Sequence, residues 1–328
     1  MKFSLQKILR VLIPVVLLGI IGNVVFTAYS SRENLLEVIQ RFNSAYFFAG
    51  ILLTFLPWLG HILRLKIWGP FIGNPLSNRD CLRIAIAQDL GGAVTPTVIG
   101  GTPIKYGLLV KKGFSHANAG IMITLQFLED LVFLNLSLPI AFIAMGGFEN
   151  TLVKGIYEDI KSHWLLIAAI VSIGVMLIFL AKKLYKNYRN ESAPSKESKL
   201  KLGFREFIET LKFVLSRGKL RFLISSTIMI LEWSSRFAIP IVLASAMGIL
   251  VDPFEIFFLH WLIWFSMLFT PTPGATGGAE GIFYYLFINF IPENLIGILI
   301  TGWRFLSYYL LTLTGAVVLQ VIGVVDRD

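Results

Sequence analysis

The stretch TPTPGATGGAEG, residues 270–281, places one acidic side chain, Glu280, behind a run of small residues inside a strongly apolar region. An ionisable side chain in such surroundings is costly, which makes it a candidate for binding substrate or protons. A structural alternative is that Glu280 only begins a helix and accepts hydrogen bonds from the amides of its first turn. The sequence leaves both readings open.

Further charged side chains interrupt apolar segments. Lys105 and Arg304 could bind phosphate, whereas Glu129 and Glu280 could offset cationic or hydroxyl groups. Arg304 could also reach a membrane surface, or pair with one of the two glutamates. Lys105 could contact an anionic headgroup or pair with Asp89.

Two spacings give more local predictions. Glu129 and Asp130 are adjacent, so on a helix they project about 100° apart and should not face the same partner. Glu232 and Arg236 are four residues apart, which favours an ion pair along one helix.

Composition indicates the surroundings of these groups. The 328 residues are 55% hydrophobic and only 15% charged, far from the balance of a soluble domain. The single cysteine, Cys81, excludes an intrachain disulfide, and the four histidines lack the spacing of a zinc-binding helix. No nucleotide-binding loop is found, so no cofactor is expected. We predict an all-α integral membrane protein.

Six apolar segments are long enough to cross a membrane, for which about 20 residues are needed. Two further apolar regions, 80–112 and 254–291, are each broken by glycine, proline and threonine, so that their arms are too short to cross alone. The sequence therefore predicts six transmembrane helices plus two re-entrant helical hairpins. The predicted spans are 8–30, 44–67, 115–146, 163–184, 221–248 and 294–323.

Charge sets the expected orientation, because basic residues of short loops stay in the cytoplasm. Residues 182–221 contain twelve basic and four acidic side chains, a net +8 of the chain's +9. We expect the loop 185–220 to be cytoplasmic and to attract anionic inner-leaflet lipids, with a short amphipathic helix over 203–217. Nucleic-acid binding is not indicated. Both termini and the stretch with Arg64 and Arg83 fall on the same side.

This topology makes the two hairpins enter from opposite faces. Residues 44–146 and 221–323 then form two repeat units of inverted topology within one domain, 1–328, and their breaks share the strings TPT and GG. Broken helices of this kind build substrate sites in many transporters. The predicted lipid-binding site comprises the two breaks and four charged side chains: Thr95, Pro96, Gly100, Gly101, Thr102, Lys105, Glu129, Pro271, Pro273, Gly274, Gly277, Gly278, Glu280 and Arg304.

Three regions carry a resemblance to a known family: residues 91–120, residues 270–281 and WRFLSYYLLTLTG at 303–315. The chain resembles the transmembrane, flippase-like domain of lysylphosphatidylglycerol synthases, without the cytoplasmic synthase domain. The chain departs from the family pattern at three positions. Thr102 stands where an acid is common, Lys105 where Arg is common, and Asp130 where Arg often follows the glutamate.

The resemblance implies a lipid translocator rather than an enzyme, in the cell (inner) membrane of a prokaryotic-type cell. The expected partners are a lipid headgroup and either a second copy of the chain or a separate lipid-modifying enzyme. Two other functions stay open. One is an integral-membrane transferase that acts on a lipid-linked substrate, with Glu280 or Glu129 as general base, and the other is a non-catalytic scaffold in envelope-lipid synthesis.

Overall fold

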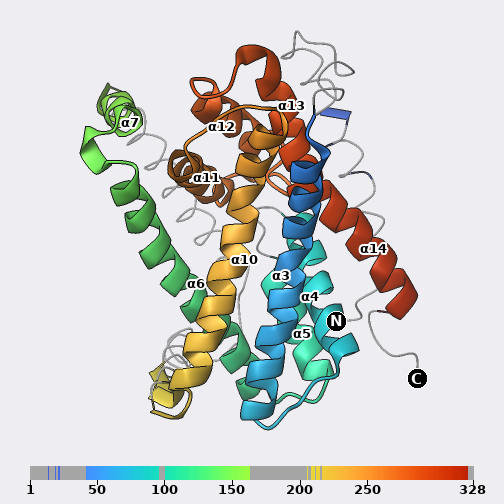
Figure 1. Ribbon diagram of the computed structural model, residues 1–328. Helices are drawn as coiled ribbons and strands as arrows, with labels where there is room; N and C mark the ends of the chain where they lie inside the picture. Colours follow the sequence, from blue (N-terminus) through green and yellow to red (C-terminus); the bar gives the residue numbers. More distant parts are fainter. Residues whose placement is uncertain are drawn as a thin grey trace, which may run out of the picture.

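The computed structural model describes residues 42–95, 100–162 and 216–323, together with scattered residues before 23 and between 205 and 214. Over these parts of the chain the structure is helical and contains no strand. Figure 1 shows the long helices running lengthwise through the molecule at different tilts, with several shorter helices lying across its upper end.

The centre of the molecule is a pair of long helices, α3 (Ser44–Phe71) and α10 (Lys219–Ala246). They run antiparallel, because the start of α3 meets the end of α10, where the amide of Asn43 donates to the Ala246 carbonyl at 2.8 Å. Their sides approach closely at Gly60, where a Cβ atom would overlap the Glu232 side chain. The small residue thus lets a carboxylate lie directly between the two helices.

The first hairpin consists of α4 (Asn78–Ala93) and α5 (Gly101–Lys111). The side chain of Ser77 caps α4 by accepting from the Asp80 amide at 3.1 Å. The two arms touch backbone to backbone at Gly101, where a Cβ atom would lie 2.6 Å from the Gln88 carbonyl oxygen. Helix α6 (His116–Ala144) follows.

The second hairpin consists of α11 (Pro253–Met267) and α12 (Gly278–Phe287). Asp252 caps α11, where its side chain accepts from the amides of Phe254 and Glu255. The closing helix follows in three parts, which are α13 (Glu293–Arg304), a π-helical turn η2 (Phe305–Tyr309) and α14 (Leu310–Ile322).

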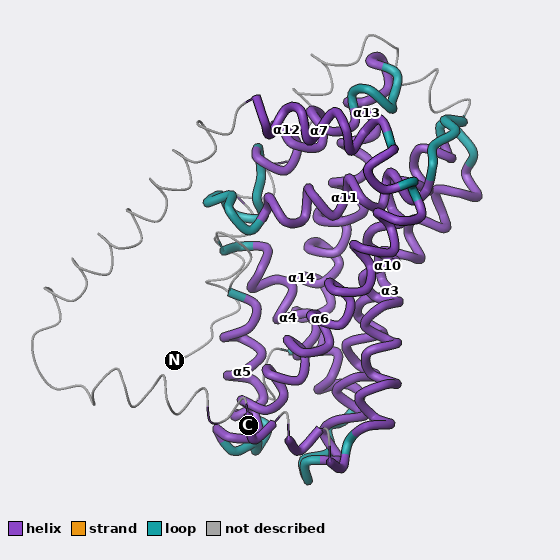
Figure 2. Tube along the Cα trace, turned by 90° about the vertical axis from the view of Figure 1, so that its left-hand side faces the viewer, coloured by secondary structure: helices purple, strands orange, loops and turns teal. Residues whose placement is uncertain are grey.

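The two hairpins lie at opposite ends of the bundle. In Figures 1 and 2, α4 and α5 lie beside the C-terminal part of α3, whereas α11 and α12 lie at the other end, near the C-terminal end of α10. Each hairpin follows a long helix and precedes another, so the order of elements is the same in both halves. The short helix α7 (Thr151–Ser162), which follows the 3-10 turn η1 (Gly147–Glu149), was not predicted from the sequence.

Four helical stretches are long and apolar enough to cross a membrane: Ser44–Phe71, His116–Ala144, Lys219–Ala246 and Glu293–Ile322. They agree with four of the six predicted spans. The other two, 8–30 and 163–184, fall outside the described residues. Helices α4, α5, α11 and α12 have 10 to 16 residues each, fewer than the roughly 20 that a crossing needs.

The basic loop also lies mostly outside the described residues. The described positions between 205 and 217 are helical, in line with the predicted amphipathic helix. The ring of Phe213 packs against that of Phe71 at 4.8 Å, and Val214 is buried. At these positions the apolar face packs on the end of α3 instead of facing outward.

Candidate functional site

A cavity of about 450 Å³ lies where the two hairpins meet the long helices. Its wall includes Gly92 and Ala93 at the tip of the first hairpin and Gly274 at the tip of the second. Trp58, Trp233, Trp264 and Trp303 contribute aromatic surface, and ionisable side chains come from α3, α4, α6, α10, α11 and α13. A pocket of this size accommodates a small polar group.

The predicted site residues divide into two sets. Gly101, Thr102, Gly274 and Arg304 border the cavity, whereas the other described ones do not. Pro96 lies outside the described residues. The set that does not border the cavity is Thr95, Gly100, Lys105, Glu129, Pro271, Pro273, Gly277, Gly278 and Glu280.

Several residues of the second set build the hairpin tips. In the first tip, the hydroxyl of Thr95 donates to the Gly91 carbonyl at 2.8 Å and accepts from the Gly100 amide at 2.9 Å. In the second tip, the Thr272 hydroxyl donates to the Thr276 carbonyl at 2.7 Å. These contacts satisfy the polar main-chain groups that a break in a helix leaves unpaired.

Glu280 and Arg304 form a buried ion pair, with Nε 2.9 Å from Oε1. The pairing was one of the two alternatives that the sequence left open for Arg304. The guanidinium also donates to the carbonyls of Gly274 and Ala275, both at 3.2 Å. Glu280 in turn accepts from the Gly277 amide at 2.8 Å, so it also begins α12 as the structural alternative expected. Arg304 therefore fixes the second tip to α13.

Tyr308 joins the two tips. Its hydroxyl donates to the Ala93 carbonyl at 3.0 Å, and its ring lies so close to Gly274 that a Cβ atom there would come within 2.5 Å. Gly274 also has a φ of +60°, which disfavours any larger side chain. Tyr308 lies in the π-helical turn, one turn beyond Arg304, and such turns are frequent at functional sites.

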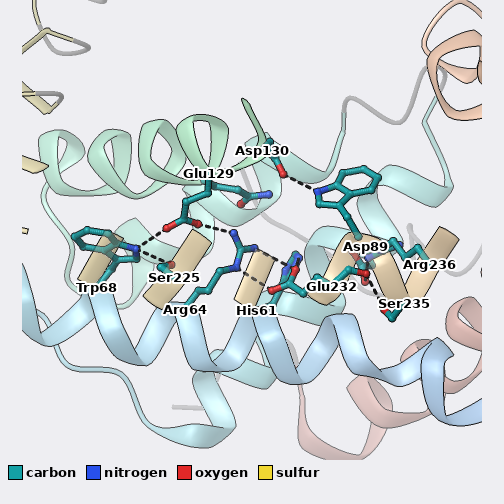
Figure 3. A network of polar contacts seen from close by, with 12 residues as sticks. His61, Arg64, Trp68, Asp89, Glu129, Asp130, Ser225, Glu232, Ser235 and Arg236 are labelled. Carbon is teal, nitrogen blue, oxygen red and sulfur yellow. Dashed lines mark hydrogen bonds and ion pairs between the residues drawn. The ribbon is translucent and has the colours of Figure 1, made fainter. Parts of the chain in front are cut away.

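A second polar cluster lies between α3, α6 and α10 (Figure 3). Arg64 is its centre, donating to Glu129 at 2.7 Å and to Glu232 at 2.9 Å. Glu129 also accepts from the indole of Trp68 at 2.8 Å, and His61 lies 3.2 Å from Glu232. All five side chains are buried, and His61 and Glu232 reach the cavity wall.

This cluster corrects one predicted ion pair. Arg64 is a buried residue of α3 and pairs with Glu129, which does not border the cavity. Glu232 pairs with Arg64 and His61, while Arg236 faces Asp89 at 3.9 Å instead. The separation expected for Glu129 and Asp130 is confirmed, because Asp130 accepts from the Trp233 indole at 3.0 Å.

Lys105 also differs from its expected pairing with Asp89. Its ammonium group donates to the Gln126 side chain on α6. Asp89 instead accepts from the Trp58 indole at 2.8 Å. Arg236 contacts Asp89 across the cavity, so helix α4 is tied to both α3 and α10.

The site therefore includes residues that the sequence-based list omitted: His61, Arg64, Asp89, Asp130, Glu232, Arg236 and Tyr308. The signal that could have found His61 and Arg64 was their place inside the apolar segment 44–67, where ionisable side chains are rare. Only the fold could show that they meet α10, 168 positions away in the case of Arg64 and Glu232.

Comparison with known proteins agrees with this architecture. The family model described as the lysylphosphatidylglycerol synthase TM region matches residues 11–315. A "UPF0104 membrane protein" of Archaeoglobus fulgidus is 27% identical over 330 residues, which cover 92% of this chain and 95% of the relative. The chain thus belongs to the family of the lysylphosphatidylglycerol synthase TM region, as its hairpin motifs predicted.

Proposed function

We propose that the protein is a lipid translocator of the cell membrane. In this proposal the polar headgroup crosses through the cavity between the hairpins while the acyl chains stay in the bilayer. The observation that carries it is that the tips of two hairpins from opposite ends of the bundle border one cavity, whose wall also contains ionisable side chains. Such a chamber gives a polar group partners at a depth where lipid provides none.

The topology that goes with this function has six spans and two re-entrant hairpins, and both termini and the basic loop lie in the cytoplasm. The C-terminal end of α3 and the first hairpin would then face the cytoplasm. The second hairpin would face outward. This arrangement places one hairpin tip on each side of the headgroup path, as an alternating-access mechanism needs.

The chemistry of the cavity wall favours transport over catalysis. Its charged side chains are mostly engaged in ion pairs: Arg236 with Asp89, Arg304 with Glu280, and Glu232 with Arg64. A carboxylate held by a guanidinium is a poor general base, because the ion pair stabilises its unprotonated form. These groups are suited to orienting a headgroup rather than to removing a proton from it.

The test is leaflet exchange of fluorescent lipids in proteoliposomes, with a matched pair of Thr→Trp variants. Thr102 borders the cavity, so Thr102→Trp should fill it and slow crossing at least tenfold. Thr227 lies exposed on α10 outside the cavity, so Thr227→Trp should leave the rate unchanged. Equal rates for both variants would place the lipid path elsewhere. No crossing of any lipid by the unaltered protein would favour the transferase or scaffold function.

A further inference from the structure

Asp130 differs from every other carboxylate at the cavity. It borders the cavity from α6, and one of its oxygens accepts from the Trp233 indole at 3.0 Å. Within the described parts of the chain, no nitrogen of Lys, Arg or His lies within 4.0 Å of its carboxylate. The other four carboxylates each have a basic partner at 3.9 Å or less: Asp89, Glu129, Glu232 and Glu280.

The side chains that border the cavity or belong to its hydrogen-bonded network include five carboxylates and, apart from His61, four basic groups. A carboxylate without a basic partner is costly in a membrane interior. The four basic groups are Arg64, Lys105, Arg236 and Arg304.

Among the described residues, the groups around Asp130 do not provide it with a basic partner. On its own helix, Glu129 adds a negative charge and Gln126 is neutral. Arg64 is shared between Glu129 and Glu232, and Lys105 donates to Gln126. The ionisable groups that face this part of the cavity from the neighbouring helices are His61 and Arg64 on α3, Asp89 on α4, Lys105 on α5, Glu232 and Arg236 on α10, and His260 on α11.

Glu280 and His61 are less suited to hold an added positive charge. Glu280 is engaged by Arg304 and by the Gly277 amide and does not border the cavity. His61 already contacts Glu232, which also pairs with Arg64. Among the carboxylates of the described residues, only Asp130 combines access from the cavity with the lack of a basic partner within 4.0 Å.

We propose that Asp130 binds one monovalent cation, a proton or Na⁺, and couples its movement to that of the lipid headgroup. The coupling rests on the proposed translocator function, whereas the binding site does not. A proton would bind the second carboxylate oxygen, and the Trp233 indole would continue to donate to the first. In either form the cation neutralises the Asp130 carboxylate, so that a headgroup and a cation can cross together.

The coupling test uses proteoliposomes with the membrane potential held at zero and either a pH or a Na⁺ gradient imposed. The probes are fluorescent phosphatidylethanolamine, phosphatidylglycerol and hexosyl diacylglycerol. If one cation accompanies each lipid, one pH unit or a tenfold Na⁺ gradient should produce about a tenfold leaflet asymmetry. Asp130→Asn should give equal leaflets, and Asp130→Glu should retain the asymmetry. Asp159→Asn is the matched control, since Asp159 is exposed and does not border the cavity.

Binding is measured independently of transport. Infrared difference spectra between pH 5 and pH 9 should contain a protonated-carboxyl band that Asp130→Asn removes. If the cation is Na⁺, radioactive Na⁺ should bind the purified protein but not this variant. Asparagine can still accept from the Trp233 indole, so the variant should fold.

The outcomes separate the two proposals. Lipid crossing without gradient dependence, together with neither binding signal, would overturn the cation site and leave the translocator. A binding signal that persists in Asp130→Asn but is lost in His61→Gln would assign the cation to His61 and overturn the proposal. Absence of lipid crossing with an Asp130-dependent binding signal would reject the translocator and keep the site.

Discussion

The two hairpins have the same place in the order of elements but are held in different ways. The first closes on itself through glycines, and at its tip Tyr308 supplies one neutral hydrogen bond to Ala93. The tip of the second is fixed by the charged groups of Arg304 and Glu280. Because charge-assisted hydrogen bonds are the stronger kind, the first tip should separate from its neighbours more readily than the second.

The second tip also requires this anchor. Gly274, Ala275 and Gly277 all have positive φ, and Ala275 at 55° is unfavourable for a residue with a Cβ atom. Arg304 holds the carbonyls of the first two. A strained turn persists only where surrounding contacts fix it, and the guanidinium provides them.

The largest expected effect is the loss of stability when Arg304, the anchor of the second tip, is replaced. Arg304→Met leaves Glu280 as a buried charge without its basic partner and removes the donor to two tip carbonyls. Breaking a buried pair on one side costs about 3–5 kcal/mol. Thermal unfolding can be followed with a thiol-reactive dye, because Cys81 is the only cysteine and is buried.

Adding Glu280→Met should restore part of that stability, because no unpaired charge then remains. The control for a simple loss of packing is Arg79→Met, which removes an exposed arginine that donates to the Ile322 carbonyl. Strictly additive effects of Arg304→Met and Glu280→Met would show that the two side chains act independently and would weaken the comparison of the hairpins.

A smaller effect is expected at the first tip. Tyr308→Phe removes the hydrogen bond to Ala93, worth about 1 kcal/mol, and keeps the ring against Gly274. Hydrogen exchange should rise at residues 91–95 and stay unchanged at 274–281. Tyr106→Phe removes a phenol that contacts His116 at 2.8 Å near the base of the same hairpin and serves as the control. An equal rise at both tips would contradict independent attachment.

The smallest effect concerns the base of the first hairpin, where Asp80 pairs with Lys112 at 2.8 Å and Arg83 at 3.2 Å. Partial burial raises the pKa of the Asp80 carboxyl. Hydrogen bonds from Lys112 and Ser77 and the charges of Lys112 and Arg83 outweigh burial, so the pKa lies below its ordinary value. The unfolded chain thus takes up the proton first as pH falls.

The stability from Asp80 is therefore present above about pH 4 and is lost as the pH falls through the lower folded-state pKa. Because the pair is partly open to solvent, it should contribute no more than about 1 kcal/mol to the free energy of unfolding. Asp80→Asn should lower the unfolding temperature slightly at pH 7, and the difference from the unaltered protein should shrink towards pH 3. A constant difference across this range would assign the stability of the base to contacts other than its charges.

How much the sequence could predict follows from the range of each interaction. Ser77, Asp252 and Pro103 lie close to where helices begin, and their signals act over a few residues, so the boundaries of the hairpin arms could be predicted. The contacts of Thr95 and Glu280 within their own tips also join residues that are close in sequence. The cavity wall is different, because its partners come from helices far apart in sequence.

Composition and apolar segment length by themselves determined that this is a helical membrane protein, and the Gly, Pro and Thr breaks determined its two hairpins. These properties depend only on neighbouring residues and on the cost of unpaired main chain in lipid. Only the tertiary structure decided which charges meet: that Arg64 pairs with Glu129 and Glu232, that Arg304 pairs with Glu280, and that Asp130 has no basic partner among the described residues. Ion pairing depends on distances of a few ångströms between side chains, and those distances are set by how helices pack rather than by their order along the chain.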